Sequence, residues 1–163
     1  MAEAAYTTRQ PAEEKGSGAV VVACSGHALQ GALREFLEHQ LKLPEGAYDI
    51  VAVPGGPQFM ALSEHLPKFA WAGQRWVGYF VEKLKVGRVV LVAHEDCTWY
   101  ADERFMPALL RALGHGELSM KDRQRRDLEQ AAAALRAALP MAVVEAYFAE
   151  KTSDGRLTFS REA

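Results

Sequence analysis

The sequence predicts an α/β fold, in which helices flank a mainly parallel central sheet with an antiparallel strand at one edge. Two segments, 18–24 and 88–93, are almost continuously apolar and rich in valine, a pattern typical of parallel strands buried on both faces. Segments with helical periodicity alternate with these strands. Residues 141–150 and 156–160 flank a Ser-Asp-Gly turn, which indicates a hairpin that places the antiparallel strand at the edge.

The first half of the chain adds one strand and two helical regions. Apolar residues at helical spacing over 29–41 predict a helix that ends before Pro44. Residues 48–54 predict a second strand, and the glycines of the Gly-Gly-Pro turn that follows it permit backbone conformations that other residues resist. Residues 59–85 are mostly helical in pattern, with a break near Pro67.

The second half adds two helices. Residues 102–113 predict a short helix, and residues 119–139 predict a long one. Ser119 and Asp122 resemble a capping box at the start of the long helix, and Pro140 marks its end. Its charged residues include both signs, which is typical of a solvated helix face. These residues are Arg123, Arg125 and Arg126, balanced by Asp122, Asp127 and Glu129.

Length and composition limit the classes of protein. A chain of 163 residues with 49% hydrophobic content fits one domain with one sizeable core, and we assign 1–17 to a flexible N-terminal arm and 18–163 to that single domain. A formal net charge of -2 argues against nucleic acid or a membrane surface as partner. Two cysteines cannot form a disulfide framework, and with no secretory leader or membrane-spanning run the expected location is cytoplasmic.

Chemistry-bearing residues follow the two valine-rich strands. Cys24 ends the first strand, and His94 and Cys97 follow the second. Ligands of open α/β sheets bind at the carboxyl ends of the strands, so if these strands are neighbours, the three side chains converge as a zinc ligand set. His27, three residues after Cys24, would close a Cys2His2 sphere; without it the fourth position is open. The alternative is a purely structural role, in which the cysteines are buried in the core and the histidine is hydrogen-bonded, with no metal.

These motifs resemble those of the beta-class carbonic anhydrases. That family carries a C-x-D-x-R motif after its first core strand and an H-x-x-C motif after a later one. VVVACSGHA and VVLVAHEDC occur here in the corresponding order and at a similar separation. The resemblance covers about 18–160 and implies that Cys24, His94 and Cys97 hold Zn²⁺. It also implies a homodimer or a dimer-based oligomer, with 1–17 as a contacting arm.

The departures from the family pattern concern reactivity. The family's Asp and Arg fall on Gly26 and Ala28, so the dyad that orients the reactive water is absent, which argues against ordinary carbon dioxide hydration. Two thiolates also cancel the charge of the ion, so neighbouring groups must contribute more to activating a nucleophile. Asp96 and His27 are the candidate catalytic residues, with Glu95 as a further acid in the loop.

Three functions are consistent with these residues. The first is a zinc-dependent lyase or hydrolase related to carbonate dehydratase, which would bind a small molecule or anion at the zinc. The second is a non-catalytic protein whose closed Cys2His2 zinc site is structural or sensing. The third is an α/β interaction domain without metal. The sequence leaves open whether the chain is an enzyme. Trp99 and Tyr100 could line a pocket near the site, although aromatic residues at such spacing more often belong to the core or a subunit interface.

Overall fold

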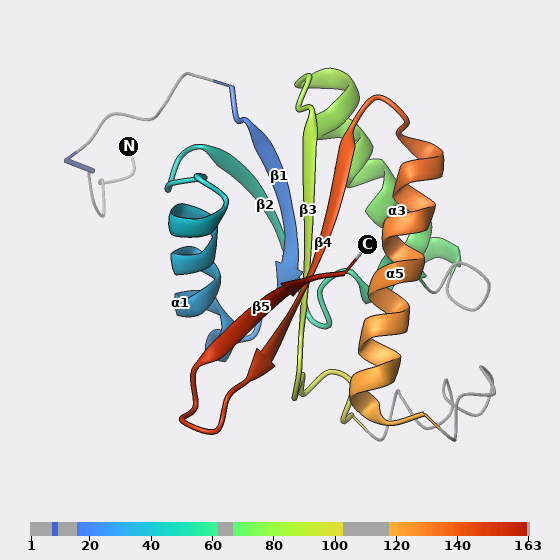
Figure 1. Cartoon of the computed structure of the whole chain (residues 1–163). Coiled ribbons are helices and arrows are strands. Elements are labelled where there is room, and N and C mark those ends of the chain that lie inside the picture. Colours follow the sequence, from blue (N-terminus) through green and yellow to red (C-terminus); the bar gives the residue numbers. More distant parts are fainter. Residues whose placement is uncertain (1–7, 10–15, 62–66, 103–117, 163) are drawn as a thin grey trace, which may run out of the picture.

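A computed structural model describes residues 8–9, 16–61, 67–102 and 118–162. Its centre is a five-stranded sheet in the order β2-β1-β3-β4-β5 (Figure 1). Neighbouring strands are parallel except for β4 and β5, which form an antiparallel edge. The predicted α/β fold with its antiparallel edge strand is therefore confirmed. The strands are β1 (Ala19–Cys24), β2 (Tyr48–Val53), β3 (Arg88–His94), β4 (Val143–Lys151) and β5 (Leu157–Arg161).

The register places the two valine-rich strands side by side. β1 pairs with β3 from Val20 opposite Val89 to Ala23 opposite Val92. Every residue of β1 is buried, as expected for a central strand covered on both faces. Since the two strands run parallel, the end of β1 at Cys24 lies at the same edge of the sheet as the end of β3.

Helices cover both faces of the sheet. On one side lies α1 (His27–Glu35), which continues into the π-helical turn η1 (Phe36–Gln40). The opposite face is covered by α3 and α5 (Figure 1), together with α2. These elements are α2 (Gln58–Ala61), α3 (Pro67–Gly78) with its π-helical extension η2 (Tyr79–Lys83), and α5 (Met120–Ala138).

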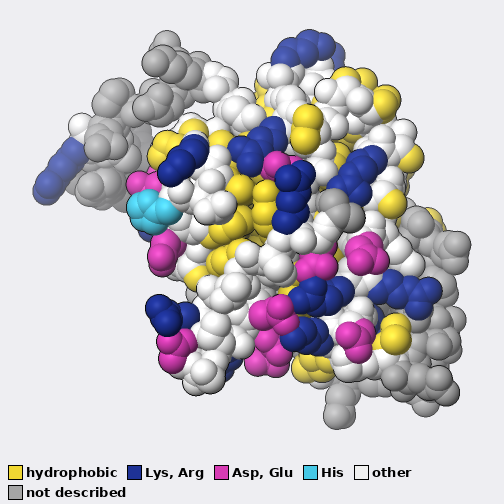
Figure 2. Space-filling view, viewed as in Figure 1, with side chains coloured by type: hydrophobic (Ala, Val, Ile, Leu, Met, Phe, Trp, Pro, Cys, Tyr) yellow, Lys and Arg dark blue, Asp and Glu magenta, His cyan; other side chains and the backbone are white. Residues whose placement is uncertain are grey.

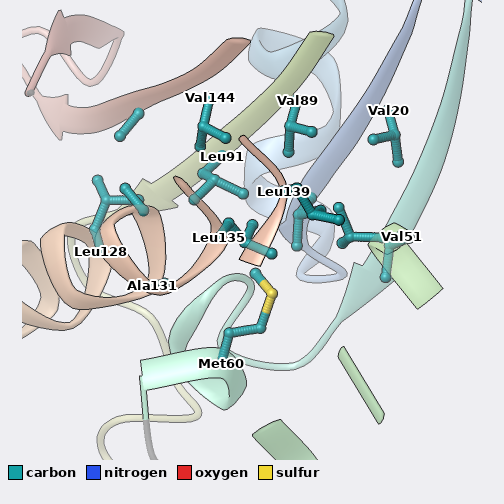
Figure 3. Packing of buried hydrophobic residues seen from close by; sticks show 14 of the residues in the cluster. Val20, Val51, Met60, Val89, Leu91, Leu128, Ala131, Leu135, Leu139 and Val144 are labelled. Carbon is teal, nitrogen blue, oxygen red and sulfur yellow. The ribbon is translucent and has the colours of Figure 1, made fainter. Parts of the chain in front are cut away.

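Two apolar clusters fill the layers, because successive side chains of a strand point to opposite faces. Val20, Val89 and Leu91 pack against α2, α3, η2 and α5 (Figure 3). Ala19 and Val21 belong to the cluster under α1, which also includes Cys24 and Cys97 of the strand ends. The candidate site therefore borders a closed core.

The start of the long helix is confirmed, and the interpretation of its charged face is partly wrong. The Ser119 hydroxyl accepts a hydrogen bond from the Asp122 backbone N–H at 3.1 Å. Arg123 and Asp127, however, are only 5% and 2% exposed. They lie one turn apart on the stripe of α5 that packs against α2 and β3, so i,i+4 spacing buries both together. The predicted helix at 102–113 and most of the arm fall outside the described residues.

Charges of both signs are mixed on the face seen in Figure 2. Glu150 pairs with Lys121 and with Arg125, and Arg125 also pairs with Glu162. Within the described ranges, no helix is long and apolar enough to cross a bilayer.

Candidate metal centre

Two neighbouring strands bring one imidazole and two thiols together. Cys24 is the last residue of β1, His94 is the last residue of β3, and Cys97 lies in the loop that follows. Their ligand atoms all lie within 4.8 Å of one another, and the two Sγ atoms are 3.7 Å apart. Both cysteines are free and buried. The convergence predicted from the two motifs is therefore confirmed.

The ring of His94 is oriented as a ligand would be. Its Nδ1 lies 2.8 Å from the backbone oxygen of Glu95, to which a protonated Nδ1 donates, leaving the lone pair on Nε2 free. Nε2 is buried and has no hydrogen-bond partner among the described residues. A buried polar atom without a partner is costly. An ion bound between Nε2 and the two thiolates would remove that cost, so these residues fit a soft divalent metal such as zinc.

The electrostatics of the pair favour one thiolate before any ion binds. A hydrogen bond from Cys97 lowers the pKa of Cys24 to about 4, with help from His94 and from the backbone N–H groups of Gly26 and Gly55, although burial opposes this shift. Cys24 and burial raise the pKa of Cys97. Burial lowers the pKa of His94, but the Cys24 thiolate, the Glu95 backbone carbonyl and Asp96 together raise it by more. The pair thus shares a proton that a bound metal would displace.

The other candidate residues lie around this group rather than within it. His27 is the first residue of α1 and is exposed. Asp96 is also exposed and adopts a left-handed backbone conformation with φ 57. Glu95 points to the end of β4, where its carboxylate accepts a hydrogen bond from the backbone N–H of Lys151 at 2.9 Å. The charge of Asp96 contributes to the raised pKa of His94, as does the backbone carbonyl of Glu95.

Position 26 lies directly beside the first thiol. The backbone N–H of Gly26 points to Cys24 Sγ at 3.3 Å, and a Cβ built on Gly26 would lie 3.5 Å from the same sulfur. Gly26 has φ -60 and ψ 130, a conformation open to any residue. A side chain at this position would therefore border the metal, and here none is present.

The Gly55-Gly56 turn closes the site from the side of β2. Both glycines have positive φ. A Cβ on Gly56 would lie 2.9 Å from the backbone nitrogen of Cys24 and 3.2 Å from the carbonyl oxygen of Val92. A Cβ on Gly55 would lie 2.5 Å from the ring of Trp99. Glycine is required twice here, because backbone or an indole ring occupies the space of a side chain.

The structure also reveals a buried polar cluster that sequence reasoning missed. Trp99 Nε1–H donates to the side-chain oxygen of Gln58 at 2.7 Å, and the Gln58 amide donates to Asp127 at 3.1 Å. The Tyr100 hydroxyl donates to the same Asp127 oxygen at 2.9 Å. Gln58 and Asp127 are each 2% exposed, and Tyr100 is 4% exposed. The i,i+4 spacing of Arg123 and Asp127 did not indicate this burial, because opposite charges at the same spacing are common on exposed helix faces.

Comparison with known proteins rests on structure alone. No protein-family model and no curated protein matches the chain. A carbonic anhydrase from Streptococcus mutans is similar, with a TM-score of 0.56, 15% identity, and coverage of 94% of this chain and 87% of that chain. So are a carbonic anhydrase from Glaciozyma antarctica (0.52, 19%, 88% and 82%) and a tetrameric beta-carbonic anhydrase from Sordaria macrospora (0.51, 14%, 91% and 84%).

These likenesses define the class of the fold. The chain has a carbonic anhydrase-like α/β fold. At the carboxyl edge of its parallel strands it carries a Cys-His-Cys group that is close enough to hold a metal. The low identities fit a divergent sequence on this fold.

Proposed function

We propose that the chain is a divergent member of the beta-carbonic anhydrase family that binds one Zn²⁺ through Cys24, His94 and Cys97. The observation that carries this proposal is the buried Nε2 of His94, which lies in a 4.8 Å cluster with both sulfurs and has no hydrogen-bond partner among the residues that the structure describes. Zinc is the metal best suited to one imidazole and two thiolates. When bound, it would act as a Lewis acid on a small electrophile or anion.

The fourth position is open to an exchangeable ligand in this proposal. His27 is exposed at the start of α1 and lies outside the cluster of ligand atoms. No side chain projects from position 26 toward the sulfur. The charge of Asp96 contributes to the raised pKa of His94. We therefore assign Asp96 as the group that accepts or supplies a proton at the mouth of the site.

The activity we propose is that of a zinc-dependent lyase or hydrolase, with carbon dioxide hydration weak. Efficient proton transfer needs a group held within hydrogen-bond reach of the reacting atom, and Gly26 and Ala28 supply none. The alternative is a closed Cys2His2 site with His27, in which zinc is structural or sensing. It requires the ring of His27 to turn from solvent toward Cys24.

Metal analysis of the purified protein tests the central claim. We expect about one zinc per chain, and Co²⁺ substituted for zinc should give the intense charge-transfer absorption of thiolate ligation. Cys24→Ser and Cys97→Ser should each lower the zinc content to below about a tenth, since a hydroxyl stays protonated and does not replace a thiolate. A folded wild-type protein free of zinc after purification with added Zn²⁺ would overturn the proposal.

Assembly and location complete the proposal. A homodimer or dimer-based oligomer is supported by the likeness to a tetrameric beta-carbonic anhydrase. A cytoplasmic location is supported by two free thiols, because thiols persist in reducing compartments. Sedimentation of the purified protein measures the first, and a monomer at micromolar concentration would contradict it.

A further inference from the structure

We infer that Asp127 is a positioning residue for the metal centre, which acts through Tyr100, Gln58 and Trp99 to hold both thiols at ligand spacing. This inference rests on the proposed zinc site and deepens it. Asp127 lies on α5, outside the loops that carry the ligands, and its carboxylate receives hydrogen bonds from Gln58 and from Tyr100.

The connection to Cys97 runs through the backbone of the loop. Trp99 and Tyr100 follow Cys97 directly, and the backbone N–H of Tyr100 donates to the Cys97 carbonyl at 3.0 Å. The backbone contact of Cys97 therefore comes from a residue whose side chain is itself bound by Asp127.

The connection to Cys24 runs through the glycine turn. The indole of Trp99 occupies the space beside Gly55 where a Cβ would lie, and its N–H is fixed by Gln58. The same turn packs against Cys24, since a Cβ on the adjacent Gly56 would lie 2.9 Å from the Cys24 backbone nitrogen. The ring of Trp99 thus contacts the turn beside Cys24, while the backbone of Trp99 belongs to the loop that carries Cys97.

Burial makes the Asp127 carboxylate depend on its hydrogen-bond partners. A carboxylate that is 2% exposed is tolerated only when it is paired and hydrogen-bonded. Burial and the charge of Asp127 raise the pKa of Tyr100 well above its ordinary value, so the phenol remains a donor at every working pH. The positive charge of the buried Arg123 interacts with the same carboxylate. The loop conformation that makes these hydrogen bonds to Asp127 is also the one that carries Cys97.

The test compares Asp127→Asn with Leu128→Val in the full chain. Leu128 is buried on the same helix and belongs to the apolar cluster, so its variant loosens packing without removing a hydrogen bond of this group. Zinc loss to a chromophoric chelator is timed for wild type and both variants. We expect about tenfold faster loss from Asp127→Asn, the effect typical of groups that orient metal ligands, and little change from Leu128→Val. Equal rates in the two variants would overturn the inference.

A metal-free measurement separates this inference from the proposed zinc site. Phenylarsine oxide binds a closely spaced dithiol: two As–S bonds replace the bonds to oxygen, and the oxygen leaves as water with the two thiol protons. We expect Asp127→Asn to bind this probe about tenfold more weakly than Leu128→Val does. If wild type lacks zinc but this difference is found, the zinc proposal fails and the positioning role stands.

Tyr100→Phe provides a second variant in case Asp127→Asn folds poorly. It removes one hydrogen bond to Asp127 and keeps the aromatic ring. It should show a smaller acceleration of zinc loss than Asp127→Asn, and the double variant should lose zinc no faster than Asp127→Asn alone, since both changes break the same link. Additive effects would contradict a shared route.

Discussion

The loops that follow β1 and β3, beside the two thiols, differ in how they are held. After β3, Trp99 and Tyr100 anchor their side chains to Gln58 and Asp127, and Glu95 is tied to the end of β4. After β1, the contacts are made mainly by backbone. The N–H of Ser25 reaches the end of β2, and that of Gly26 reaches the Cys24 sulfur, while the side chains of 25, 27 and 28 are exposed.

This difference also concerns the surroundings of the proposed ligands. The end of β3 and the loop after it carry two of the three proposed ligands, His94 and Cys97. The end of β1 carries the third, Cys24, but the loop after it has no side chain at position 26, where one would border the metal. The two strand ends thus share the proposed ligands, while the loop after β1 lacks a side chain beside the first sulfur.

The largest effect should come from adding the missing groups to the loop after β1. We expect Gly26→Asp with Ala28→Arg to raise carbon dioxide hydration by about a hundredfold, within the usual range for a positioned proton-transfer group. The backbone at Gly26 suits aspartate, and the nearest atom to its Cβ is Cys24 Sγ at 3.5 Å. Stopped-flow hydration assays with a pH indicator measure the rate.

The matched control is Gly26→Asn with Ala28→Arg, whose amide has the same shape but accepts no proton at neutral pH. It should remain near the wild-type rate. Equal rates for the two double variants, both with full zinc content, would show that the loop after β1 does not limit reactivity.

An effect of intermediate size should come from the Gly55-Gly56 turn that follows β2. Gly56→Ala places a Cβ 2.9 Å from the Cys24 backbone at a positive φ, so we expect the free energy of unfolding to fall by about 3 kcal/mol, from strain and overpacking together. Gly155→Ala also has a positive φ but meets nothing within 4 Å, and should cost about 1 kcal/mol. Urea unfolding of both variants provides the comparison, and equal losses would contradict close packing at Gly56.

The smallest effect should come from His27→Ala. Because its side chain is exposed at the start of α1, we expect the zinc content and the rate of zinc loss to change by less than about twofold, as for other exposed residues outside such features. Metal analysis and the chelator assay measure this directly. Loss of zinc on this substitution would support the closed Cys2His2 site instead.

Patterns that are local in the sequence predicted most of the fold. β1 and β3 are apolar along their lengths, and the cap at Ser119 needs only two residues three positions apart, so both were visible before the structure. The convergence of Cys24 with His94 and Cys97 was conditional on β1 and β3 being neighbours, which their pairing confirms. The prediction that Arg123 and Asp127 face solvent was wrong, because mixed charges on a helix do not show which of its sides packs against the sheet.

The sequence by itself therefore determined the strands, the described helices and the three residues proposed as ligands, since hydrophobic periodicity and motif spacing are properties of short segments. Only the tertiary structure decided what surrounds those ligands. Gly26 and Trp99 stand at comparable distances along the chain from a cysteine, yet one leaves an empty position beside the sulfur and the other joins α2 and the glycine turn. The physical reason is the distance along the chain. The hydrogen bonds between Gln58, Trp99, Tyr100 and Asp127 join segments up to 69 residues apart, and these segments become neighbours only when the helices pack on the sheet.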